Sequence, residues 1–254
     1  MKKPLLITLP KRIFDIFGSL FGLLILSPLL LLVIFLIWKS DKHSPFYIAT
    51  RVGKNEKVFK MIKLRSMIID AEATGVDSTG NNDSRITPIG QFIRKYKLDE
   101  ITQLVNVFIG QMSLVGPRPN VKRETDLYTD LEKNLLTVKP GITDFASIVF
   151  SDEGSILANA KNPDIAYNQL IRPGKSRLAL FYVKNMNFHL DFKIVILTLL
   201  SQLNRKSALE KIARVIEQKG GSEELIKLCL RQDALVPSPP PGSMNIVTTR
   251  DLGQ

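Results

Sequence analysis

Hydrophobic positions are concentrated near the start of the chain. Residues 13–38 read IFDIFGSLFGLLILSPLLLLVIFLIW and contain a single charge, Asp15. A helix needs about 20 apolar residues to cross a bilayer, so this segment is long enough. A cleaved signal peptide has a shorter apolar region and a small-residue cleavage site, whereas this segment ends in Trp38 and Lys39. We therefore expect residues 1–40 to form a membrane-embedded helix that is retained.

Two features of this segment bear on its topology. Ser27 and Pro28 lie at its midpoint, and a proline there removes a helical hydrogen bond and bends the helix. Basic residues flank both ends, so the positive-inside rule gives no orientation; they are Lys2, Lys3, Lys11 and Arg12 before it, and Lys39 and Lys42 after it. A single kinked span and a re-entrant hairpin with both ends in the cytoplasm are both compatible with this pattern.

The pattern changes to short elements after residue 43. Residues 44–53 and 58–67 alternate as two strands around a turn. Thr87 followed by Pro88 predicts a helix that runs to about residue 97. A second helix is expected over 99–109, with a buried apolar stripe and a polar opposite side. The stripe is Leu98, Ile101, Leu104, Val105 and Phe108, and the opposite side is Asp99, Thr102, Gln103 and Asn106.

The second half of the chain is predicted to be mostly helical. Helices are expected at about 121–136, 207–219 and 222–232, and the apolar stretch within 178–203 is too short after its last charge to span a membrane. That stretch is expected to be a core or interfacial helix. The SPPPG tail predicts extended or disordered chain. The sequence thus predicts an α+β fold, with a membrane helix (1–40), a small, mostly helical domain with short strands (41–205) and a helical extension with a Pro-rich tail (206–254).

Charge and cysteine content narrow the classes of partner and compartment. Lys and Arg total 35 against 24 Asp and Glu, a formal net charge of +11, which favours phosphates, anionic lipid or nucleic acid as partners. The single cysteine, Cys229, excludes an internal disulfide and fits a reducing compartment. Two histidines are too few for a His-based metal site.

Two adjacent carboxylates, Asp99 and Glu100, stand at the start of the second predicted helix. Acidic residues there can simply cap free N–H groups and suit the helix dipole. Nearby basic residues favour a chemical role instead: Arg94, Lys95 and Lys97 upstream, Arg118 between Pro117 and Pro119, and Lys60, Lys63 and Arg65, which we expect on one face of a strand. A carboxylate beside fixed cations suits phosphoryl transfer, because the cations and a divalent metal neutralise charge on the phosphate.

Five sequence blocks together resemble the bacterial sugar transferase family, the monotopic phosphoglycosyl transferases that load polyprenyl phosphate. They lie between about residues 11 and 203 and read KRIFDIFGSLFGLLILSP (11–28), RVGKNEKVFKMIKLRSM (51–67), IGQFIRKYKLDEITQLVNVFIGQMSLVGPRP (89–119), KPGIT (139–143) and YVKNMNFHLDFKIVILTLL (182–200). Their order and spacing make the resemblance specific, although each block alone is a weak signal.

The resemblance implies a reaction and roles. Asp99 is implied to attack the β-phosphorus of a UDP-sugar, expel UMP and form an aspartyl-phosphosugar, which polyprenyl (undecaprenyl) phosphate then accepts. Glu100 is implied to bind Mg²⁺ with Asp99 or to handle the acceptor's proton. The phosphate-binding residues implied are Lys63, Arg65, Arg94, Pro117, Arg118 and Pro119. The product would begin a surface polysaccharide or glycoconjugate such as capsule, O-antigen or exopolysaccharide.

The resemblance also implies a location. The apolar segment would be a re-entrant helix broken at Ser27 and Pro28, with the catalytic domain on the cytoplasmic face of the bacterial inner membrane and against its anionic lipid. The sequence departs from the family after KPGIT, where the usual Gly, aromatic or Leu, Ala and Gln are replaced by Asp144-Phe145-Ala146-Ser147. Residues 152–175 also differ and are a candidate wall of the sugar pocket.

One competing function remains open from composition. A membrane-tethered basic module could bind nucleic acid or organise a polysaccharide assembly complex without catalysis. The sequence has no helix-turn-helix and no aromatic stacking platform, so we expect no nucleic acid partner. The identity of the sugar and whether the chain forms a homodimer are left open.

Overall fold

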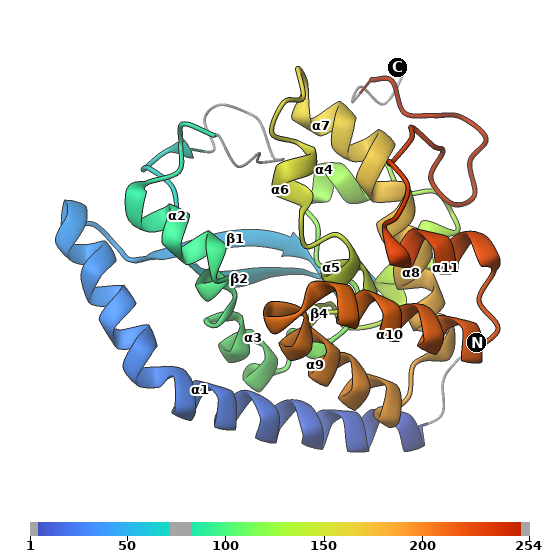
Figure 1. Ribbon diagram of the computed structural model, residues 1–254. Coiled ribbons are helices and arrows are strands. Elements are labelled where there is room, and N and C mark those ends of the chain that lie inside the picture. The colour runs from blue at the N-terminus through green and yellow to red at the C-terminus, as the bar shows by residue number, and fades with distance from the viewer. Residues whose placement is uncertain (1–4, 72–82, 250–254) are drawn as a thin grey trace.

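The long apolar segment forms one continuous bent helix. The computed structural model describes residues 5–71 and 83–249, with side chains from Leu9 onward. Helix α1 covers Leu5–Asp41 and contains Pro28 without ending there. Figure 1 shows α1 curving around one side of the domain. Because Pro28 has no N–H to give Leu24, the Ser27 hydroxyl donates to that carbonyl instead, at 2.7 Å. The helix therefore bends at a satisfied proline rather than breaking into two.

The strands of the domain form two small sheets. Strands β1 (Phe46–Val52) and β2 (Val58–Leu64) pair antiparallel, with Phe46 opposite Leu64 and Val52 opposite Val58, as the alternating pattern predicts. The turn between them is the short helix η1 (Lys54–Glu56), in which Asn55 has a positive φ of 55°. Strands β3 (Ser113–Val115) and β4 (Gly141–Thr143) pair in parallel.

Helices fill the remainder of the domain. Those before residue 140 are α2 (Pro88–Lys95), η3 (Leu98–Glu100), α3 (Gln103–Ile109), α4 (Lys122–Thr125) and η4 (Glu132–Thr137). Those after it are α5 (Phe145–Val149), α6 (Glu153–Ile156), α7 (Pro163–Ala166), η5 (Tyr167–Ile171), α8 (Arg172–Asn185), α9 (Phe188–Leu203), α10 (Arg205–Gln218) and α11 (Glu223–Leu230). The prediction of a mixed but mostly helical fold behind a long apolar helix is confirmed.

The helix predicted over 121–136 is wrong as one element. Its two ends are helical, as α4 and η4, but residues 126–131 between them are not. The second piece starts anew because Thr129 and Glu132 form a reciprocal cap: the Thr129 hydroxyl accepts from Glu132 N, and Glu132 Oε2 accepts from Thr129 N, both at 3.1 Å. The predicted start of α2 is confirmed, since Thr87 caps it by accepting from Gly90 N at 3.0 Å.

The buried side of the segment η3–α3 follows the prediction only in part: Leu98 of the predicted stripe is buried and Ile101 packs beside it. Thr102, Gln103 and Asn106 are buried, whereas Phe108 of the predicted apolar stripe is 43% exposed. The reason is the edge of β2 that β1 leaves unpaired. Asn106 accepts from Ile62 N at 3.0 Å and donates to Lys60 O at 2.7 Å. Burial of these backbone groups requires partners, so the polar side of α3 faces the strand.

The main hydrophobic core lies among the C-terminal helices. Tyr182 of α8, Ile194 of α9 and Ile212 of α10 are all fully buried in it, and α5 contributes Phe145. Cys229 of α11 is also fully buried there. Helix α5, which carries one wall of the candidate site, packs into this core.

The Pro-rich tail lies against the domain in an extended form. Pro241 O accepts a hydrogen bond from the Thr129 hydroxyl at 2.5 Å, and Val247 O accepts one from Gln169 at 2.8 Å. Ser238 N donates to Gln169 O at 3.1 Å. Of the two states expected for this segment, the structure has the extended one.

Candidate active site

The two adjacent carboxylates stand on a sharp turn between α2 and α3. Lys97, just before them, has a positive φ of 53°, which is unusual for a residue with a side chain. Asp99 and Glu100 follow in the single turn η3. The Thr102 hydroxyl then donates to Ile62 O at 3.0 Å and ties this turn to β2. The chain therefore holds the carboxylates beside the strand that carries Lys63.

Asp99 forms an ion pair with one of its two oxygens. Lys63 Nζ donates to Asp99 Oδ2 at 3.3 Å, and both side chains are mostly buried, at 17% and 15% exposed. Among the residues that the structure describes, none is hydrogen-bonded to Asp99 Oδ1. One oxygen is thus oriented by a cation while the other remains available to a substrate.

Glu100 pairs with the arginine that the sequence places between two prolines. Arg118 donates to Glu100 Oε1 at 2.8 Å. Burial acts to raise the pKa of Glu100, but Arg118, Lys63 and Lys97 outweigh it and lower this pKa to about 2. The carboxylate beside Arg118 in turn raises the pKa of that guanidinium. Glu100 is therefore a fixed negative charge near neutral pH.

The loop that carries Arg118 is held by backbone contacts with the KPGIT segment. Gly116 N donates to Thr143 O at 3.0 Å, and Gly141 N donates to Pro117 O at 2.9 Å. A Cβ on Gly141 would lie 2.0 Å from Gly116 N, so no side chain fits there. Both motifs have a glycine at this position because their backbones are in contact there. This contact places Arg118 next to residues 143–147.

Further cations surround the pair. Arg94 donates to the Ser66 hydroxyl at 3.1 Å, and burial lowers its pKa while the charge of Asp99 acts to raise it. Burial likewise lowers the pKa of Lys97, against the charge of Glu100. The sequence indicates Lys97 only as a basic neighbour of Asp99, whereas the structure brings it into the charge cluster with Arg118.

Two predicted cations lie elsewhere. Lys60 and Lys63 are three positions apart on β2, which puts them on opposite faces, so the expectation of one shared face is wrong. Lys60 donates to the Thr50 hydroxyl at 2.8 Å. Arg65 makes a two-pronged ion pair with Asp41 at the end of α1, at 2.5 and 2.7 Å. In this arrangement the guanidinium of Arg65 is occupied by α1 rather than by Asp99 or Glu100.

The donor set fits a magnesium ion shared with a substrate. Within residues 5–71 and 83–249, no three His, Cys, Asp or Glu side chains gather as a complete metal cage. Mg²⁺ usually takes one or two carboxylates and completes its shell with water and substrate phosphates. Asp99 and Glu100 supply such a pair of carboxylates.

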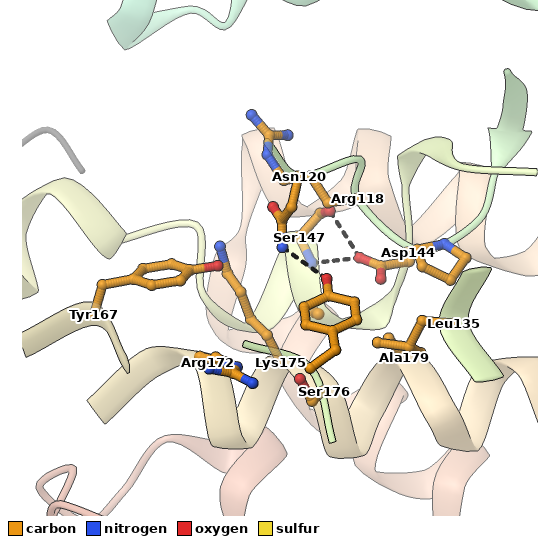
Figure 2. Close-up of a pocket in the computed structure, with 13 residues that line it drawn as sticks. Arg118, Asn120, Leu135, Asp144, Ser147, Tyr167, Arg172, Lys175, Ser176 and Ala179 are labelled. Atoms are coloured by element: carbon orange, nitrogen blue, oxygen red, sulfur yellow. Dashed lines mark hydrogen bonds between the residues drawn. The ribbon is translucent and has the colours of Figure 1, made fainter. Parts of the chain in front are cut away.

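A hollow opens beside Arg118. Figure 2 shows its walls, which include Arg118, Asp144, Ser147, Tyr167 and Lys175. Lys175 forms an ion pair with Glu153 of α6. The sequence pointed to this region only through its departure after KPGIT and through residues 152–175. Tyr167 and Lys175 carry no local motif, and their place at the site depends on how η5 and α8 pack.

Comparison with known proteins places this arrangement in a family. Residues 6–205 match the family model described as bacterial sugar transferase. The exopolysaccharide production protein PSS of Rhizobium leguminosarum bv. phaseoli is 38% identical over 77% of this chain and 96% of its own length. A putative undecaprenyl-phosphate N-acetylgalactosaminyl 1-phosphate transferase of Bacillus subtilis (strain 168) is 42% identical over 52% of this chain and 70% of its own.

Other relatives are longer than this chain. The UDP-glucose:undecaprenyl-phosphate glucose-1-phosphate transferase of Klebsiella pneumoniae is 32% identical over 78% of this chain but only 41% of its own length. This chain therefore spans about two fifths of that relative and nearly all of the Rhizobium protein. The family model covers the apolar helix, the two carboxylates and the Arg118 loop together, and the chain belongs to the bacterial sugar transferase family.

Proposed function

We propose that this sugar transferase moves a sugar 1-phosphate from a UDP-sugar to polyprenyl phosphate through a covalent intermediate on Asp99. The observation that carries the proposal is the pair of carboxylates set among partly buried cations, with one Asp99 oxygen held by Lys63 and the other without a hydrogen-bond partner among the described residues. Relatives named for sugar-phosphate transfer to undecaprenyl phosphate support the substrate classes. The product would begin a surface polysaccharide, as the name of the Rhizobium relative suggests.

In the first step, Asp99 Oδ1 attacks the β-phosphorus of the UDP-sugar. The new bond joins that oxygen to phosphorus, the bond from phosphorus to the bridging oxygen breaks, and UMP leaves with that oxygen. Lys63 holds the other carboxylate oxygen, so the nucleophile keeps one orientation. Arg94 and Lys97 provide positive charge close to where charge builds on the phosphate.

In the second step, an oxygen of polyprenyl phosphate attacks the same phosphorus. The acyl-phosphate bond breaks, Asp99 is released as a carboxylate, and the lipid carries a diphosphate-linked sugar. Glu100 is poorly suited to accept a proton here, because its pKa of about 2 is far from neutral. We therefore favour a role for Glu100 in binding cations over a role in proton transfer. Mg²⁺ held by Asp99 and Glu100 would neutralise phosphate charge.

The contacts of α1 support a re-entrant helix in the membrane. At its start, Lys11 pairs with Asp191 at 2.6 Å and Asp15 accepts from Leu114 N at 2.9 Å. At its end, Asp41 pairs with Arg65. A straight helix of 37 residues would be about 55 Å long at 1.5 Å per residue. The hydrocarbon core of a bilayer is about 30 Å thick, so a straight helix that crossed it would have its two ends on opposite sides. Because both ends bind one domain, both belong on one side of the membrane.

Exposed apolar side chains define the surface that would enter the lipid. On α1 they include Phe17, Phe21, Leu24, Leu31 and Phe35, and on α9 they are Phe188, Phe192, Ile196, Leu199 and Leu203. The two helices meet where the Phe14 ring packs edge-on against the Phe188 ring, with centroids 5.5 Å apart. An apolar face of this extent marks a membrane or protein contact. We propose that it lies in the cytoplasmic leaflet.

The proposal is tested by UMP release. Purified protein in detergent or bilayer discs is given UDP-glucose, UDP-galactose, UDP-N-acetylglucosamine or UDP-N-acetylgalactosamine, with Mg²⁺ and undecaprenyl phosphate. Without acceptor, we expect a burst of UMP equal to the enzyme present and sugar phosphate bound to the protein in a form that hydroxylamine removes. Asp99→Asn should abolish both signals.

The matched control is Asp130→Asn. Asp130 makes an ion pair with a lysine as Asp99 does, but its side chain is 98% exposed on the outer surface. This variant should behave as wild type. Turnover retained by Asp99→Asn would overturn the nucleophile assignment, and an absence of UMP from every donor with wild-type protein would overturn the function.

A further inference from the structure

A buried carboxylate oxygen without a hydrogen-bond donor lies close to the phosphoryl site. Asp144 is fully buried. Its Oδ1 caps α5 by accepting from Ser147 N and from the Ser147 hydroxyl, both at 2.7 Å. Among the described residues no donor reaches Asp144 Oδ2, although this atom is itself buried. Buried carboxylate oxygens are normally hydrogen-bonded, so this one points to a donor that the chain does not supply.

Asp144 is one of the residues that line the hollow beside Arg118. Asp144 and Ser147 line it with Arg118, Tyr167 and Lys175, and Figure 2 shows Asp144 and Ser147 joined at its inner wall. The hollow measures ≈ 30 Å³. About two water-sized groups fit in such a volume. A hydroxyl-bearing edge of a small molecule therefore fits in the hollow.

Arg118 connects the hollow to the reacting phosphate. One of its nitrogens donates to Glu100, next to Asp99, and the same side chain lines the hollow. In a UDP-sugar the sugar is bonded directly to the β-phosphate that Asp99 would attack, whereas the uridine is one phosphate further away. The group that lies beside the reacting phosphate is therefore the sugar.

We propose that Asp144 Oδ2 accepts a hydrogen bond from a hydroxyl of the donor sugar and thereby selects which UDP-sugar is used. This inference rests on the proposed function. A site built to bind a substrate hydroxyl discriminates strongly, because a sugar with the hydroxyl in another orientation leaves the buried carboxylate unpaired. Asp144 thus acts as a specificity residue, while Asp99 carries the chemistry.

The test is Asp144→Asn. The amide keeps an oxygen to cap α5 but replaces the acceptor at Oδ2 by a donor. With the four UDP-sugars above, kcat/KM for the preferred donor should fall by about tenfold to a hundredfold, the range expected for a hydrogen bond to a charged group. Other donors should lose less, so the ranking of donors flattens. Inhibition by UMP should be unchanged, because UMP lacks the sugar.

The control is Asn204→Ala. It removes the side chain that caps α10 by accepting from Ser207 N at 3.0 Å and does not line the hollow, so it should lower the thermal midpoint yet keep the wild-type ranking of donors. A shift of the Asp144→Asn midpoint by added UMP shows that this variant is folded.

Three results would overturn the inference. One is wild-type ranking and kcat/KM in Asp144→Asn, which leaves the proposed function intact. Another is weaker inhibition by UMP in that variant, which would assign the hollow to the nucleoside. The third is wild-type protein that releases no UMP from any donor, in which case the proposed function fails first and the specificity role with it.

Discussion

The ion pair between Arg65 and Asp41 decides between two roles for one arginine. The family resemblance assigns Arg65 to phosphate, whereas in the structure both of its terminal nitrogens bond to Asp41, and its Nε donates to Ser44 O at 2.8 Å. Asp41 is the last residue of α1. We predict that Arg65 fastens the end of the membrane helix to the domain and contributes little to phosphate binding.

The magnitude follows from the exposure of the pair. Hydrogen bonds to charged groups contribute about 1.5–3 kcal/mol when well shielded, and exposed ion pairs contribute about 0–1 kcal/mol. The Arg65 side chain is 11% exposed and that of Asp41 33%, which lies between these cases. Discounting for solvent screening, we expect a coupling free energy of about 1–2 kcal/mol between the two side chains.

The assay is a double-mutant cycle with two measurements. Arg65→Gln, Asp41→Asn and the double variant are compared by urea unfolding in detergent and by UMP release. Each single variant should lose about 1–2 kcal/mol of unfolding free energy, and the double variant should lose no more than the larger single loss, because both changes remove the same contact. UMP release at saturating UDP-sugar should remain within about threefold of wild type in all three variants, since this coupling acts on stability rather than on the reacting phosphate.

Different behaviour of the two single variants would refute this reasoning. If Arg65→Gln loses UMP release by about a hundredfold while Asp41→Asn keeps it, Arg65 binds phosphate as the resemblance implies. The control cycle uses Lys133→Gln and Asp130→Asn, a pair of exposed side chains at 55% and 98%. Its coupling should be close to zero, and a value as large as that of Arg65 and Asp41 would show that the cycle does not measure a specific contact.

Three further outcomes are expected. Asn106→Leu leaves Ile62 N and Lys60 O without partners, so it should lower the unfolding free energy measured by urea titration by about 2–6 kcal/mol. A loss below about 1 kcal/mol would contradict the role of this contact. The pKa of Glu100 is lowered to about 2 from 4.5, so its ionised form stabilises the fold above pH 4.5 and this contribution is lost as pH falls towards 2. In Glu100→Gln the thermal midpoint should therefore depend less on pH between these values than in wild type. A pH dependence equal to that of wild type would contradict this prediction. Pro28→Ala returns an N–H to the helix interior, where proline costs about 3 kcal/mol, and so favours a straight helix. Part of the population should then span the membrane, with an N-terminal tag outside the cell. Tags that stay wholly inside would contradict the role of the bend.

Local sequence signals predicted the elements whose cause is local. The antiparallel strands follow from alternation, and the cap at Thr87 follows from the residue types at a helix start. The bend of α1 follows from one proline, and its hydrogen-bond repair follows from the serine before it. The two carboxylates were found because Arg94 and Lys97, which are close to them in sequence, also lie in their charge cluster. Their direct ion-pair partners, Lys63 and Arg118, are distant in sequence.

Contacts with residues that are distant in sequence were not predicted from the sequence pattern. Periodicity assigned Asn106 to solvent because it is polar, yet the exposed edge of a two-stranded sheet requires hydrogen-bond partners, and Asn106 supplies them. The family resemblance assigned Arg65 to phosphate, whereas its ion-pair partner in the structure is Asp41 at the end of α1. Residue type alone does not give the partner, so each of these assignments required the three-dimensional structure.

The backbone contact between Gly116 and Gly141 explains how the site depends on the whole domain. Gly116 and Gly141 place their backbones in contact, so the loop with Arg118 and the turn with Asp144 are positioned by one junction. Behind that junction, α5 packs into the core of C-terminal helices. A change in that core therefore reaches Arg118 and Asp144 together, whereas Asp99 is held separately by the contacts of α3 with β2. The proposed nucleophile and the proposed specificity residue thus rest on different contacts, so we expect that the donor preference can change without loss of the chemical step.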